Sequence, residues 1–187
     1  FRGEVEIHGG DNVEIASFDS STGPTFDDEV NVLALDGVSI LSYDSSIGLA
    51  FGSDVEIDGG RSVVVGSLGE STGPAFSSET KIAFAESVFI ASGDASKGAV
   101  FGGKVTIKGF GNVAIESFHA STGPAFNDKV DVVTVDAASF RSHDSSIGPA
   151  FEKGVEIDAG EVWITSFGTS IGVAFERGAK IISADIV

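Results

Sequence analysis

The stretch STGPAF at residues 121–126 decides the fold, because versions of it return along the whole chain. It stands unchanged at 71–76, reads STGPTF at 21–26, and recurs as SIGLAF at 46–51 and SIGPAF at 146–151. Internal repeats have to be recognised first, since they determine the architecture of the entire chain. Three interpretations of the stretch are open: a catalytic serine motif, a ligand-binding loop, or one corner of a structure built by repetition.

The repeat has a period of 25 residues. Cutting the chain before each phenylalanine of the motif gives eight units, of which the seventh has 24 residues and the last is about half a unit. We call these units coils 1 to 8, and we number positions within a coil as columns, with the phenylalanine in column 1. The coils start at Phe1, Phe26, Phe51, Phe76, Phe101, Phe126, Phe151 and Phe175.

Each coil carries the residue pattern of β-strands. Columns 5, 7, 13 and 15 hold mainly valine and isoleucine with mostly polar residues between, as in Val5-Glu6-Ile7 and Val55-Glu56-Ile57. Alternation of β-branched apolar and polar residues is typical of a strand with one buried face. Helical periodicity is absent from every 10-residue segment. Each coil is therefore expected to supply two clear strands and a shorter third around the phenylalanine.

The strict register of the columns favours a solenoid over an antiparallel meander. Coils that lie on one another about 4.8 Å apart bring identical residues into ladders along the axis. The sequence therefore predicts an all-β, right-handed parallel β-helix of about 7.5 coils, forming a single domain over residues 1–187. Column 10 alternates between Gly10 or Gly60 in odd coils and Leu35 or Val135 in even coils. The unit could thus be a 50-residue double coil, either as a trace of duplication or as a spacing that matches a partner.

Three ladders are expected to hold the stack together. The first is the column-1 phenylalanines, which we place in the core. The second, column 17, is Ser17, Ser42, Ser67, Ser92, Ser117, Ser142 and Ser166, and the third, column 23, is Gly23, Gly48, Gly73, Gly98, Gly123, Gly148 and Gly172. The serines are expected to donate hydrogen bonds at a tight corner, and the glycines to supply a positive φ there.

A catalytic interpretation of the serines is disfavoured. A nucleophilic serine needs a base placed beside it, but seven coils repeat the serine and the chain holds only His8, His119 and His143. We therefore expect no enzyme activity, no catalytic residues and no cofactor.

Composition excludes several partners. The chain has 28 acidic and 11 basic residues, a net charge of −17, which disfavours nucleic acid and anionic membranes. No apolar run is long enough for a membrane span, and the absence of cysteine excludes disulfides. Acidic residues repeat in column 4 and column 19, as in Glu4, Glu29, Asp54 and Asp19. A solvated acidic face is expected there, with weak Ca²⁺ binding as the alternative.

Column 18 is the candidate outward contact row. It contains Phe18, Tyr43, Phe118, His143 and Phe167. Because column 18 follows the inward serine, these rings face outward if the strand continues. They could then stack on sugar rings or on a neighbouring rod. The alternative is that the chain turns and packs the rings against the corner.

The segments VEIASFDSSTGPTF (13–26) and VAIESFHASTGPAF (113–126) resemble repeats of polymorphic outer-membrane proteins and of autotransporter adhesin passengers. In that resemblance Ser117 occupies the small polar position and Gly123-Pro124-Ala125-Phe126 the corner. It implies a surface β-helix of the adhesin, fibre or secreted-scaffold type.

The functional expectation follows from the ladders and the resemblance together. It is a non-enzymatic structural or adhesive protein, extracellular or at the cell surface, acting as a fibre or filament subunit or as a segment of a longer β-helix. Its partners would be other copies, head to tail or side by side, and glycans. The alternative function is a carbohydrate-binding or carbohydrate-active β-helix protein, and an ice-binding or cation-binding module ranks third.

Overall fold

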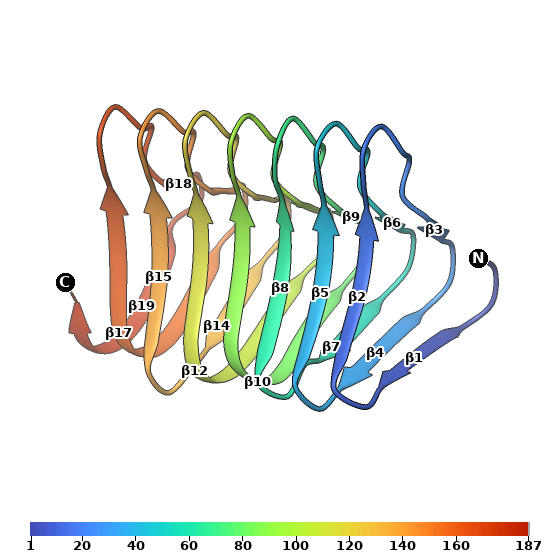
Figure 1. Ribbon diagram of the computed structural model, residues 1–187. Helices are drawn as coiled ribbons and strands as arrows, with labels where there is room; N and C mark the ends of the chain where they lie inside the picture. Colours follow the sequence, from blue (N-terminus) through green and yellow to red (C-terminus); the bar gives the residue numbers. More distant parts are fainter. Residues whose placement is uncertain (187) are drawn as a thin grey trace.

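The chain winds into about seven turns of a parallel β-solenoid, with strands stacked at equivalent columns of successive coils. The computed structural model describes residues 1–186, with side chains to residue 183, so the last residue of the predicted half coil, Val187, lies outside the described residues. Residues 1–186 contain no helix. The two chain ends marked in Figure 1 lie at opposite ends of the rod. The predicted β-solenoid with about 25 residues per coil is confirmed.

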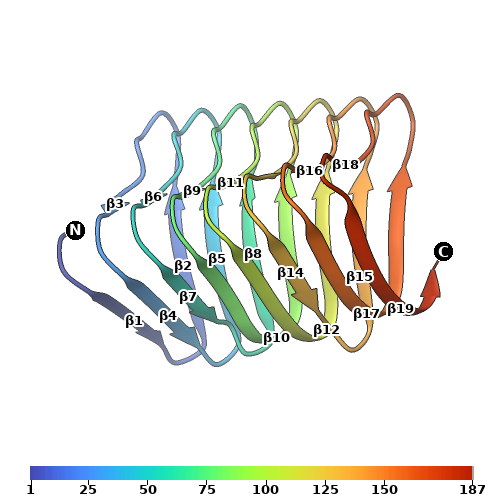
Figure 2. The ribbon, with the colours of Figure 1, turned by 180° about the vertical axis from the view of Figure 1, so that it is seen from behind.

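Each coil has two long sides and one short side. The strands of the first long side are in front in Figure 2, and those of the second are in front in Figure 1. The first side contains β1 (Val5–Gly9), β4 (Val30–Ala34), β7 (Val55–Asp58), β14 (Val130–Val133) and the start of β19 (Ala179–Ile186), which follows β17 around the corner. The second contains β2 (Asn12–Ser17), β5 (Gly37–Ser42), β8 (Ser62–Ser67) and β15 (Ala137–Ser142). Strands β10 (Thr80–Ser92), β12 (Val105–Ser117) and β17 (Val155–Ser166) continue from one long side to the other.

The short side carries the column-1 phenylalanines. Its two-residue strands are β3 (Thr25–Phe26), β6 (Ala50–Phe51), β9 (Ala75–Phe76), β11 (Val100–Phe101), β13 (Ala125–Phe126), β16 (Ala150–Phe151) and β18 (Ala174–Phe175). Neighbouring rings of the column stack with centroids 4.7 to 5.1 Å apart. From Phe26 to Phe151 the rings are buried, whereas Phe1 is exposed. Burying one such ring contributes about 1.5–3 kcal/mol, so the column is a large part of the core.

Valine and isoleucine from the two long sides complete the core. Val30 and Ile57 on the first side, and Ile40 and Val63 on the second, are fully buried. The residue-by-residue register, for example Val30 with Val55 and Ile40 with Val65, follows the 25-residue period. Stacked coils thus bury side chains that a single coil would leave in water.

The prediction that the column-23 glycines supply a positive φ is wrong. None of them has a positive φ, and the left-handed residue of the corner is instead in column 19. There, Asp19, Asp44, Asp94, His119 and Asp144 have φ between 57° and 59°. Aspartate tolerates this region because its short side chain hydrogen-bonds locally. A Cβ on Gly48 would lie 2.5 Å from the Gly73 carbonyl carbon, so close approach of successive coils requires glycine in column 23.

Candidate functional site at the corner between the long sides

The column-17 serines from Ser17 to Ser142 are buried inside the stack, next to the column-21 serines of the following coil, whereas Ser166 is exposed. Their hydroxyl oxygens are 3.0 Å apart in the pair Ser17–Ser46 and 3.1 Å apart in the pair Ser117–Ser146. Ser46 also donates to the backbone carbonyl of Ser17, at 3.1 Å. These four hydroxyls are buried and hydrogen-bonded to one another in pairs, whereas the buried Ser42 hydroxyl has no hydrogen-bond partner among the described residues.

Column 18 forms two short aromatic stacks on the outer surface. Phe18 and Tyr43 stack at 4.9 Å, and His143 lies between Phe118 and Phe167 at 4.8 and 5.0 Å. Burial, and secondarily the charge of Glu14, raises the pKa of the Tyr43 phenol. Leu68 and Gly93 separate the two stacks. Because neighbouring rings cover each other's faces, a ligand meets mainly ring edges.

A charged cluster lies beside the second stack. The carboxylate of Glu116 is only 9% exposed and lies 3.8 Å from Arg141 Nη1 and 3.8 Å from His143 Nε2. Ser139 donates to it at 3.2 Å. Sequence reasoning missed this cluster, although Glu116 and Arg141 occupy column 16, where Ala16, Gly66 and other small or apolar residues stand.

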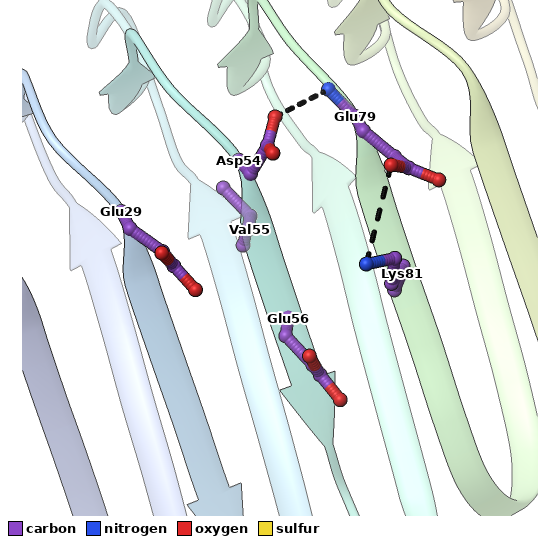
Figure 3. Close-up of a pocket in the computed structure, with 6 residues that line it drawn as sticks. All are labelled: Glu29, Asp54, Val55, Glu56, Glu79 and Lys81. Atoms are coloured by element: carbon purple, nitrogen blue, oxygen red, sulfur yellow. Dashed lines mark hydrogen bonds and ion pairs between the residues drawn. The ribbon is translucent and has the colours of Figure 1, made fainter.

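The outward face of the first long side is acidic in its N-terminal coils. Glu29, Asp54, Glu56 and Glu79 line a cavity of about 40 Å³ with Lys81. Figure 3 shows the side chains of Glu29 and Glu56 without an interaction to the other residues drawn. Asp54 accepts a hydrogen bond of 3.1 Å from the backbone N–H of Glu79. The column-4 acids predicted to form a solvated face therefore lie together on the surface.

The same face carries a lysine network in its C-terminal coils. Lys129 Nζ lies 2.8 Å from Asp131 and 3.6 Å from Glu156, and Lys104 lies 3.4 Å from Asp131. Burial would raise the pKa of Asp131, but the hydrogen bonds and charges of Lys129 and Lys104 outweigh it and lower that pKa. The hydrogen bond and charge of Lys180 lower the pKa of Glu156.

The corner between the two long sides carries a row of exposed apolar side chains, which we call the corner row. It consists of Leu33, Leu35, Phe84, Phe110, Val133 and Val135. Leu35 is 73% exposed and Val135 is 67% exposed, well beyond what a core residue shows. A rim of charged residues borders the row, including Arg61, which pairs with Asp36 at 3.5 Å. An apolar patch inside a polar rim is typical of a contact surface.

The repeat is locally broken in the middle of the corner row. The register between β10 and β12 shifts on both sides of Ala85, which leaves Phe84 without a backbone partner on β12. Phe84 has a φ of 55°, an uncommon conformation for an aromatic residue. Its ring lies 6.2 Å from that of Phe110, and both line a cavity of about 350 Å³. Val133, Val135, Lys108 and Asp158 are on its other walls.

Comparisons with known proteins found nothing similar to this chain. Neither a family model, nor a characterised protein, nor a solved structure matches it. Within residues 1–186, no helix is both long and apolar enough to cross a membrane. Among the side chains described, those of residues 1–183, no group of three or more His, Cys, Asp or Glu residues is arranged to hold a metal ion. The corner row, the column-18 stacks and the charged face are therefore interpreted from their own chemistry.

Proposed function

We propose that the protein is a non-enzymatic structural or adhesive solenoid that acts by associating with other copies. It would be a fibre or filament subunit, or a segment of a longer β-solenoid, outside the cell or at its surface. The corner row carries this proposal, because Phe84, Phe110, Val133 and Val135 are exposed apolar neighbours that line one cavity, and soluble monomers rarely leave such a patch uncovered. The ladder architecture supports it, since a rod presents the same contact at regular intervals along its length.

Two contact modes are open to such a rod. Side-by-side association would use the corner row. Head-to-tail stacking would use the outer edges of β1 and β2, which among residues 1–186 pair on one side only, with β4 and β5. An unpaired strand edge offers N–H and C=O groups to another chain.

Sedimentation velocity and negative-stain imaging over a series of protein concentrations test the proposal. We expect growth from monomers to dimers and longer assemblies. Phe110→Ser should reduce this growth, because it removes an exposed ring of the corner row. Phe18→Ser is the matched control, since Phe18 is also half exposed but belongs to a column-18 stack on another part of the surface. Monodisperse monomers of the unaltered protein at every concentration would overturn the proposal.

Carbohydrate binding is the second candidate, supported by the half-exposed rings of Phe18 and Phe167 at the ends of the column-18 stacks. Aromatic rings with one open side can pack on the apolar face of a sugar. A glycan array with the unaltered protein and with Phe18→Ala/Phe167→Ala tests this candidate. A hit lost in the variant supports it, and the absence of any hit removes it.

A further inference from the structure

We draw no further inference here: the strongest candidate, the apolar cavity beside Phe84 and Phe110 at the corner between the two long sides, carries nothing further because nothing in the part of the chain that the structure describes shows what covers it.

Discussion

The outward face of the first long side has two halves with the same backbone, one acidic and one in which lysines and carboxylates pair. In coils 1 to 3, columns 4 and 6 hold Glu4, Glu6, Glu29, Asp54 and Glu56 but no lysine. In coils 5 to 8 the same columns hold lysines and carboxylates joined by ion pairs. The parallel register continues through both halves. The strand spacing thus accepts either charge pattern.

Magnitudes explain why the acidic half still stacks. Two like charges 4 Å apart repel by roughly 1 kcal/mol in water. One buried phenylalanine contributes about 1.5–3 kcal/mol, and every coil adds valines and isoleucines to the core. The inner columns therefore determine that the coils stack, and the outer columns adjust the local stability. Four predictions test this difference between the halves.

The largest effect is expected from Lys129→Glu, which breaks the C-terminal network at its centre. Lys129 lies between Asp131 and Glu156, so a glutamate there adds a third negative charge to the pair. We expect a fall in Tm of about 3–6 °C, measured by thermal unfolding followed by circular dichroism. Lys108→Glu makes the same change in net charge away from this network. An equal loss in the two variants would mean that net charge alone matters.

Acid should weaken the C-terminal half through Asp131 and Glu156. Both have pKa values lower in the folded chain than their ordinary values. A carboxyl whose pKa is lowered by folding stabilises the fold above its unfolded pKa, near 4, and loses that contribution as pH falls through the folded pKa. The Tm of the unaltered protein should therefore fall below about pH 4. The fall should be smaller in Asp131→Asn/Glu156→Gln, and identical pH profiles would refute the assignment.

Asn31→Lys should stabilise the N-terminal half by giving it the lysine–carboxylate contacts that the C-terminal half has. Asn31 pairs in register with Glu6 on one side and Glu56 on the other, so a lysine there meets two carboxylates. We expect a rise in Tm of about 1–3 °C. Thr106→Lys is the control in the same column, because its register neighbours are Lys81 and Asp131. A rise in the control as large as in Asn31→Lys would show that local charge does not decide the outcome.

The inner columns could be predicted from the sequence, and the corners could not. Repetition brings each residue next to its own equivalents, so the phenylalanine and valine columns indicate the stack directly. Turn geometry has no such periodic signal. The left-handed conformation belongs to Asp19 and its equivalents rather than to the column-23 glycines. The repeated aspartate of column 19 could have indicated the left-handed position, since aspartate is among the residues that tolerate a positive φ.

The candidate surface was missed for a related reason. Column 10 showed the alternation of Leu35 and Val135 with glycine, but the register shift that leaves Phe84 unpaired depends on how β10 and β12 bend around the corner. Alternation of apolar and polar residues predicts which face of a strand is buried, and it contains no information on a bulge. The cluster of Glu116, Arg141 and His143 likewise depends on three residues from two coils meeting on one face.

Salt should produce the smallest effect and should act in opposite directions on the two halves. Screening weakens repulsion among the carboxylates around Glu29 and Glu56, and it also weakens the attraction between Lys129 and Glu156. Raising the salt concentration from about 0.05 M to about 0.5 M shortens the screening length from more than 10 Å to only a few ångströms. Hydrogen exchange followed by mass spectrometry should then show slower exchange, by about twofold, in peptides covering β4 and faster exchange in peptides covering β14. A change of the same sign in both peptides would mean that the charge pattern of the outer columns has no local effect, and that the solenoid responds to salt as a single unit.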